Sequence, residues 1–483
     1  MKIAKIGVMA GVLFLAVLLV AGQAEESPAE RRARELIGFL NKGNRTEFQK
    51  YVEGNFSPEM LKMPMNAHLD FYSSLYDNSR GYEIKGVQDK QQNEATMLVK
   101  NNLTGEWDEL LLRVEADSPF RIAGIGFRVP KLPVESSPKK LTEKEISRQM
   151  DTLMKKLAAA DVFSGAVLLA RNGVPVYQGV FGMANKDFNV PNRIDTKFNL
   201  GSMNKMFTSV AIAQLVEKGN LSFEDPLSKF IPDFPDRESA AKIKIKHLLT
   251  HTAGLGGYFS EKWGNRSRAG FRTVDDMMKQ AREDEKLLFE PGTRWRYSNT
   301  GMLVLGKIIE IVSGRSYYDY VRENIFKPAG MLDTDCYELD KVNSNLAVGY
   351  DKKYADSGIT FSNNIFMHVM RGGPQGGGYS TVGDLLKFEQ ALRSHKLVGA
   401  EYVKLLTTAK PELNSPNYGY GFQIGPGGKR FGHSGGFPGI SSNLETFSES
   451  GWTAIVMSNY SQGSQPVTQK MRTLIENFSA AGK

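Results

Sequence analysis

The stretch Asn199-Leu200-Gly201-Ser202-Met203-Asn204-Lys205-Met206 places a serine at the start of a long apolar segment and a lysine three residues later. If Ser202 lies in the first turn of a helix, Lys205 stands on the same face, about 5–6 Å away between Cβ atoms. A hydroxyl with an amine beside it to accept its proton is an activated nucleophile. The start of a helix also favours a developing oxyanion, because its N–H groups are free and carry partial positive charge.

The pattern Ser-x-x-Lys is weak alone, because other serines also match it: Ser136, Ser137 and Ser239. The first two lie in a polar, proline-bearing stretch that offers no wall for a pocket. Ser239 lies in a charged stretch that is typical of a solvated surface. Only Ser202 precedes a long apolar pattern with helical spacing, so it is the candidate nucleophile.

Bulk composition narrows the function classes. With 483 residues, 41% hydrophobic and 24% charged, the chain is expected to fold as two globular domains. A net charge of +8 is mild at this length, and no dense basic stripe with interleaved aromatics is present, so we expect no nucleic-acid partner. The single cysteine, Cys336, excludes an internal disulfide and a cysteine metal cluster. No His-Glu-x-x-His spacing occurs, and we expect no metal and no organic cofactor.

The first residues predict export. Lys2 and Lys5 precede an apolar run from Ile6 to Val20, and small residues precede Glu25. This pattern predicts a signal peptide over residues 1–24 and a periplasmic or secreted protein. The alternative is an uncleaved anchor, which would tie the protein to a membrane.

Two folded regions are expected after the leader. Residues 27–130 read as helices followed by four strands, which predicts a small α+β domain. Its layout resembles the nuclear-transport-factor-2-like fold, although no motif supports this. Residues 131–141 read as a linker rich in Pro, Ser and Lys.

Residues 142–480 predict a larger α/β domain. A capping box begins at Thr142 and starts a helix. Two apolar runs joined by Arg171-Asn172-Gly173 predict a β-hairpin, and further strand-like runs lie between residues 418 and 459. We therefore expect an antiparallel sheet flanked by helices and completed by both ends of this region.

Two further stretches follow the nucleophile in the chain: Tyr297-Ser298-Asn299 and His433-Ser434-Gly435-Gly436. In the order Ser-x-x-Lys, Tyr-x-Asn, His-x-Gly, the chain resembles the penicillin-binding and class C β-lactamase superfamily of serine hydrolases, from about Thr142 to Phe478. The resemblance implies an α/β sandwich: an antiparallel sheet beside an all-helical lobe, with the site in the groove between them.

The resemblance also implies roles for individual residues. Ser202 would be acylated, Lys205 would help to remove its proton, and Tyr297 would relay a proton to the leaving group. The backbone N–H groups of Ser202 and Gly436 would form the oxyanion hole. The substrate would contact Asn299, His433, Ser434 and Gly435.

The sequence leaves the identity of the base open. A neutral lysine at pH 7 needs its pKa lowered from about 10.4 to near 7, which costs roughly 4–5 kcal/mol. A tyrosinate needs a comparable lowering, roughly 4 kcal/mol. Lys205 and Tyr297 are expected to titrate as a coupled pair.

Several other patterns are explained by chance or by a structural role. Tyr76-Asp77-Asn78 matches Tyr-x-Asn but precedes the nucleophile, so we interpret it as a chance match. Gly432 to Gly436 fits the Gly-x-Ser-x-Gly elbow of α/β-hydrolases, but no histidine follows Ser434 to serve as its base. His247 and His251 are expected to be structural, and Trp295 is expected in the core.

The third motif bears on the substrate. His433 stands where β-lactamases of this family usually carry lysine, and His-x-Gly is more similar to D-alanyl-D-alanine carboxypeptidases, D-aminopeptidases and esterases. We expect a secreted serine hydrolase acting on a small peptide, amide or ester, with a cell-wall peptide as one candidate substrate. The alternatives are a class C-type β-lactamase, with a β-lactam substrate, and a non-catalytic module that binds or senses the cell wall.

Overall fold

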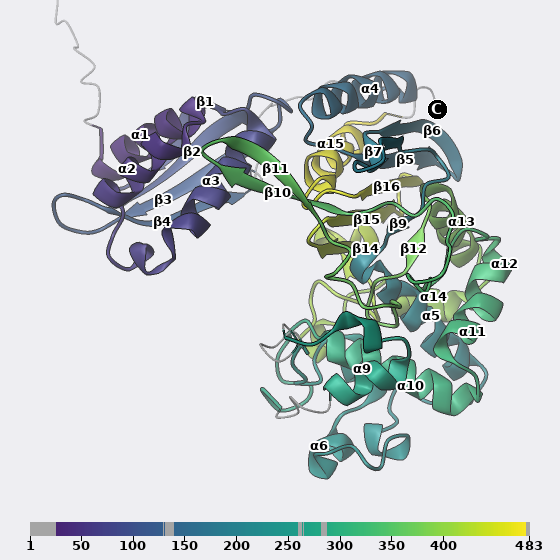
Figure 1. Ribbon diagram of the computed structural model, residues 1–483. Helices are drawn as coiled ribbons and strands as arrows, with labels where there is room; N and C mark the ends of the chain where they lie inside the picture. The colour runs from purple at the N-terminus through teal and green to yellow at the C-terminus, as the bar shows by residue number, and fades with distance from the viewer. Residues whose placement is uncertain are drawn as a thin grey trace, which may run out of the picture.

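The computed structural model describes residues 26–128, 130, 140–258, 263, 265–281 and 287–479. The predicted signal peptide and residues 131–139 of the predicted linker lie outside these ranges. A smaller N-terminal α+β region stands beside a larger body (Figure 1). Within the described ranges, no helix combines the length and the apolar character needed to cross a bilayer.

The N-terminal α+β region, residues 26–128, has its own apolar core between helices and a sheet. Its four strands form an antiparallel meander in the order β1-β2-β3-β4. The elements are α1 (Pro28–Lys42), α2 (Arg45–Asn55), η1 (Met60–Lys62), α3 (Met65–Ser79), β1 (Tyr82–Lys90), β2 (Glu94–Asn101), β3 (Trp107–Val114) and β4 (Ile122–Arg128). The four strands were predicted, but α2 was missed because its 11 residues bury only Phe48, Tyr51 and Val52.

The larger body contains a six-stranded sheet in the order β13-β14-β15-β16-β5-β6, antiparallel throughout. Its strands are β5 (Gly165–Arg171), β6 (Val174–Phe181), β13 (Gln423–Ile424), β14 (Arg430–Phe437), β15 (Ile440–Phe447) and β16 (Trp452–Ser458). β16 pairs with β5, which confirms that both ends of this region complete one sheet. Asn172 and Gly173, with positive φ angles of 48° and 80°, turn the predicted hairpin.

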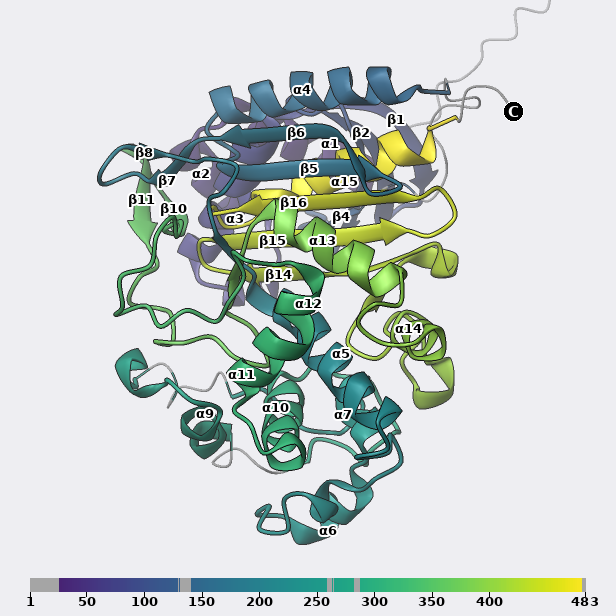
Figure 2. The same ribbon diagram turned by 90° about the vertical axis from the view of Figure 1, so that its right-hand side faces the viewer.

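Helices cover both faces of this sheet (Figure 2). α4 (Glu143–Ala159), which begins with the predicted capping box, and α15 (Ser464–Glu476) lie on one face; α13 (Val382–Arg393) lies on the other. α5 (Asn204–Glu217) is buried from residue 204 to 215, as its all-round apolar character predicts. It connects the sheet to the helical lobe.

The remaining elements build the lobe and its connections. The helices are α6 (Arg237–Lys242), α7 (Ile245–Leu249), α9 (Val274–Ala281), α10 (Asn299–Ser313), α11 (Tyr317–Val321), α12 (Lys327–Ala329) and α14 (Ala400–Leu406). Single turns are η2 (Gly201–Met203), η3 (Leu227–Lys229), η4 (Arg268–Gly270), η6 (Arg322–Phe326), η7 (Pro411–Leu413) and η8 (Pro426–Gly428). Short strands are β7 (Met183–Asn185), β8 (Val190–Pro191), β9 (Phe198–Asn199) and β12 (Tyr379–Ser380).

One hairpin was not predicted. β10 (Tyr350–Ala355) and β11 (Gly358–Asn363) form a two-stranded ribbon that leaves the body and reaches the N-terminal α+β region (Figure 1). β10 packs on α3. Most residues of β11 are exposed, so the hairpin lacks the buried alternating face from which strands are usually recognised.

Candidate active site

Ser202 lies in the tight turn η2, immediately before α5. Gly201 takes a left-handed conformation there, with φ of 52°. Its amide donates to the Asn199 side chain over 2.9 Å, and the Leu200 carbonyl accepts from the Ser442 hydroxyl over 2.8 Å. These bonds fix the nucleophile turn between the sheet and the start of a buried helix.

The end of strand β14 lies directly against this turn. A Cβ on Gly435 would come within 2.0 Å of the Leu200 carbonyl oxygen, so only glycine fits there. The amide nitrogen of Gly436 lies 3.0 Å from the position that a Cβ on Gly201 would occupy. A Cβ on Gly436 itself would meet nothing within 4 Å. The strict need for glycine is therefore at 435, whereas 436 places its N–H beside the turn and faces open space.

Lys205 is fully buried, and three oxygen atoms surround its side-chain nitrogen. Nζ lies 3.0 Å from Ser202 Oγ and 2.8 Å from Asn299 Oδ1, and it donates to the Gln375 carbonyl. No carboxylate of the described ranges pairs with it. Burial holds the pKa of Lys205 well below its usual value, which favours the neutral amine.

Tyr297 lies beside both Ser202 and Lys205. Its side chain hydrogen-bonds Ser202, and Lys205 Nζ lies 4.8 Å from the centre of its ring. Burial raises the pKa of Tyr297, because a tyrosinate would lose its hydration. The two candidate bases therefore differ: burial favours neutral Lys205 but disfavours charged Tyr297.

Asn299 begins α10 and contributes through both ends of its amide. Oδ1 accepts from Lys205, and Nδ2 has no partner within the described parts of the chain. A free N–H donor beside the nucleophile is suited to a substrate carbonyl. Gln375, whose carbonyl receives Lys205, was missed from the sequence, since a backbone acceptor has no side-chain signature.

His433 is buried, with 1% of its surface exposed. Its Nδ1 lies 2.6 Å from the Ser434 carbonyl and so must donate, which leaves Nε2 to accept from the Tyr418 hydroxyl at 2.8 Å. Burial lowers the pKa of His433 to about 3. The structure places this residue, which was predicted to contact the substrate, in the wall of the site, where burial favours the uncharged imidazole. Ser434 is half-buried, and its hydroxyl donates to Gln423 over 3.2 Å.

The aromatic surroundings confirm one expectation and correct another. His251 is buried, accepts from the Ser298 amide over 3.2 Å, and packs with its ring centre 4.4 Å from that of Tyr297 at a tilt of 45°, as a structural residue would. Trp295, expected in the core, is 46% exposed, so that prediction is wrong. It lies in the irregular segment before α10, where no periodic pattern indicates which side faces the core.

A model of the family described as Beta-lactamase matches residues 149–476 of this chain. The chain belongs to the Beta-lactamase family. This confirms the resemblance drawn from the three motifs and makes the protein a serine hydrolase of the β-lactamase and penicillin-binding superfamily. The match begins at residue 149, so the N-terminal α+β region lies outside it.

Known relatives agree with this assignment. A penicillin-binding protein of Bacillus subtilis is 32% identical over 332 residues, which cover 65% of this chain and 71% of that protein. The teichoic acid D-alanine hydrolase of Staphylococcus aureus is 28% identical over 309 residues, covering 63% and 72%. Among solved structures, a penicillin-binding protein from Bacillus halodurans superposes with a TM-score of 0.60 at 30% identity, covering 67% of this chain and 98% of that one.

Proposed function

We propose that this member of the family hydrolyses D-alanyl esters or amides through an acyl-enzyme on Ser202, with Lys205 as the base. The observation that carries the proposal is the 3.0 Å contact between Ser202 Oγ and a fully buried Lys205 Nζ. A neutral amine at this position can accept the hydroxyl proton, whereas Tyr297 is a proton carrier rather than the base.

The reaction then follows in two steps. Ser202 Oγ bonds to the substrate carbonyl carbon as its proton passes to Lys205, and the N–H groups of Ser202 and Gly436 stabilise the oxyanion. The bond to the leaving alcohol or amine breaks, and that group receives a proton through the Tyr297 hydroxyl. Water attacks the acyl-enzyme by the reverse proton path and releases the acid.

Two features support the choice of substrate. A neutral His433 on β14 provides no positive charge for a free carboxylate of the substrate. This favours an ester or amide over a carboxypeptidase substrate. The name of the Staphylococcus aureus relative indicates D-alanine as the acyl group there. Asn299 Nδ2 and the N–H of Gly436, an exposed residue of β14 beyond its pairing with β13, supply donors for the carbonyl groups of such a substrate.

Export is part of the proposal. The basic and apolar pattern of residues 1–24 supports removal of a leader after Ala24 and action outside the cytoplasm. Expression of the full chain in a bacterium, followed by intact-mass analysis of the extracellular or periplasmic fraction, tests this. A product that begins at Glu25 supports export, and a full-length product retained in the cytoplasm contradicts it.

Steady-state kinetics of the mature protein test the activity. We expect turnover of D-alanine p-nitroanilide and of a D-alanyl ester, weaker turnover of the L-isomers, and loss of both activities in Ser202→Ala. Equal rates for Ser202→Ala, or no turnover of any of these compounds, would contradict the proposal. Faster hydrolysis of benzylpenicillin than of the D-alanyl compounds would instead support the β-lactamase alternative.

A further inference from the structure

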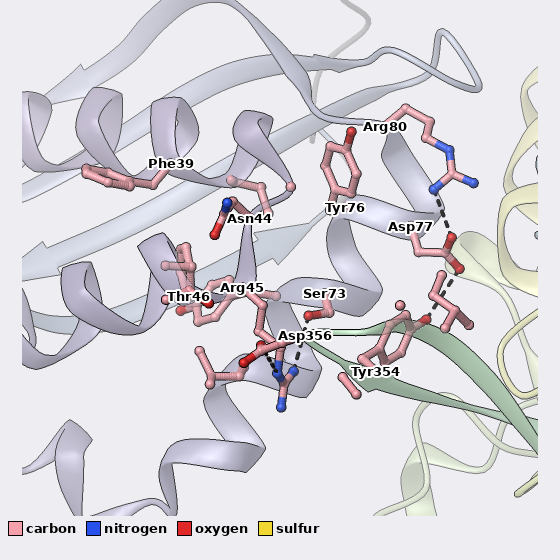
Figure 3. Close-up of a pocket in the computed structure, with 18 residues that line it drawn as sticks. Phe39, Asn44, Arg45, Thr46, Ser73, Tyr76, Asp77, Arg80, Tyr354 and Asp356 are labelled. Carbon is pink, nitrogen blue, oxygen red and sulfur yellow. Dashed lines mark hydrogen bonds and ion pairs between the residues drawn. The ribbon is translucent and has the colours of Figure 1, made fainter.

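A cavity that shares no lining residue with the site around Ser202 lies between the helices of the N-terminal α+β region and the tip of the β10–β11 hairpin (Figure 3). Its volume is about 340 Å³. Small-molecule sites in proteins span about 300–1,000 Å³, so this cavity is large enough for a small organic ligand. Tyr76, from the chance Tyr-x-Asn match, is one of its lining residues.

One part of the lining is apolar and largely aromatic. It consists of Phe39, Leu40, Phe48, Leu69, Tyr72 and, from the hairpin, Ile359. Phe48 and Tyr72 pack with ring centres 4.2 Å apart, and Phe39 stacks at 4.5 Å on Tyr51. These contacts hold the rings in fixed positions, as a preformed site for an apolar group requires.

The other part of the lining is polar and centred on Arg45. Only 13% of its side chain is exposed. Nη2 lies 2.8 Å from Asp70. Nη1 donates to Ser73 over 3.3 Å, and Nε is 3.9 Å from Asp356 (Figure 3). Of the five N–H donors of a guanidinium, only two therefore have close partners within the described ranges.

Tyr76 adds a further uncommitted polar group. Its hydroxyl has no hydrogen-bond partner in the described parts of the chain, although the residue is half-buried. Arg45 keeps donors beyond those that contact Asp70 and Ser73. Together with the Tyr76 hydroxyl and the aromatic wall, they match a carboxylate attached to an apolar body, which would compete with Asp70 and Asp356 for the guanidinium.

We propose that this cavity binds a small organic carboxylate with an aromatic or short acyl body. The carboxylate contacts Arg45 and the Tyr76 hydroxyl, and the apolar body lies against Phe39, Phe48 and Tyr72. This inference does not depend on the proposed reaction at Ser202.

The site needs both parts of the chain, because the hairpin closes one side of it. Asp77 on α3 hydrogen-bonds Lys352 and Tyr354 of β10, which docks the hairpin on the N-terminal α+β region. The other end of the hairpin lies near β14, the strand that carries Gly435 and Gly436. Asn364, just after β11, donates to the Pro438 carbonyl, just after β14, over 2.7 Å. A ligand in the cavity therefore stabilises the docked hairpin.

Calorimetric titration of mature Ser202→Ala with 4-phenylbutyrate, octanoate and N-acetyl-D-phenylalanine tests the proposal, since this background prevents turnover. The primary amides of the same acids are the neutral probes. We expect at least one carboxylate to bind and its amide to bind on the order of tenfold more weakly. Added Arg45→Gln should weaken the carboxylate by a similar factor, whereas the matched control Arg31→Gln, an exposed arginine of α1, should leave its affinity unchanged.

Tyr76→Phe gives a second, milder test that retains the ring, and it should weaken the carboxylate a few-fold. The proposal is overturned if none of the three carboxylates binds, or if amides bind equally well. It is also overturned if binding persists unchanged in folded Arg45→Gln and Tyr76→Phe, which would place the ligand in the catalytic cleft or elsewhere.

Discussion

The Nε2 atom of His433 lies 2.8 Å from the hydroxyl oxygen of Tyr418, inside the wall of the active site. This bond, with the bond from Nδ1 to the Ser434 carbonyl, uses both ring nitrogens. The histidine of the third motif therefore helps to fix strand β14, which holds Gly435 and Gly436. Burial disfavours a positive charge on its ring.

The contact predicts a structural cost for losing the tyrosine hydroxyl. Tyr418→Phe leaves buried Nε2 without its donor, so we expect the free energy of unfolding to fall by about 1–3 kcal/mol. Urea denaturation of the variant and the wild type measures the difference. An unchanged unfolding midpoint would show that the bond contributes nothing.

Acid should destabilise the protein through His433. Burial lowers its pKa to about 3, below the unfolded value near 6.5, so its contribution is fully present above pH 6.5 and is lost as the pH falls from 6.5 towards 3. The slope reaches at most about 1.4 kcal/mol per pH unit for one such group. His247, whose pKa burial lowers to about 4, adds to the effect.

Urea unfolding at several pH values between about 7.5 and 4.5 measures this loss. His433→Gln removes the titrating group, so the stability of that variant should depend less steeply on pH than the stability of the wild type. Parallel curves for the two proteins would contradict the assignment to His433.

The lowered pKa of Lys205 predicts the pH dependence of catalysis. Because burial lowers the pKa of this residue, kcat/KM should rise with pH through one protonation step far below pH 10.5 and then level off. Lys205→Arg stays protonated and should lower kcat/KM by about 10²–10⁴-fold without that step. Retention of the same acid limb in Lys205→Arg would assign the titration to another group.

Two adjacent glycines offer a matched comparison. Gly435→Ala places a methyl group 2.0 Å from the Leu200 carbonyl oxygen, and we expect a loss of stability of about 1–3 kcal/mol together with loss of turnover. Gly436→Ala places the methyl group in open space, so its unfolding should match the wild type while substrate binding weakens. Thermal denaturation and KM of both variants test this; equal melting temperatures would contradict the role of Gly435.

Much of this architecture could be predicted from sequence because it rests on local signals. The capping box at Thr142, the Asn172-Gly173 turn and the apolar strands are each encoded within a few residues. The order of the three motifs predicted that Ser202, Lys205 and Tyr297 lie in one site, and in the structure they are in contact.

The unpredicted features depend on tertiary surroundings. The sequence does not show that Tyr418, 15 residues before His433, points its hydroxyl at that histidine in the wall of the active site. Neither the Gln375 carbonyl nor the β10–β11 hairpin has a side-chain pattern that reveals it in the sequence. Trp295 has the residue type of a core position, and only the path of its irregular segment shows that it is exposed. Burial, rather than residue type, is also the reason for proposing Lys205 and not Tyr297 as the base.

The most direct test of the account is rapid acid quenching followed by intact-mass analysis and peptide mapping. The wild type and Ser202→Ala would each be mixed with benzylpenicillin and with p-nitrophenyl butyrate. We predict a covalent adduct on the wild type, mapped to Ser202, and none on Ser202→Ala. An adduct of equal yield on Ser202→Ala, or no modification of Ser202 by either compound, would contradict the acyl-enzyme mechanism.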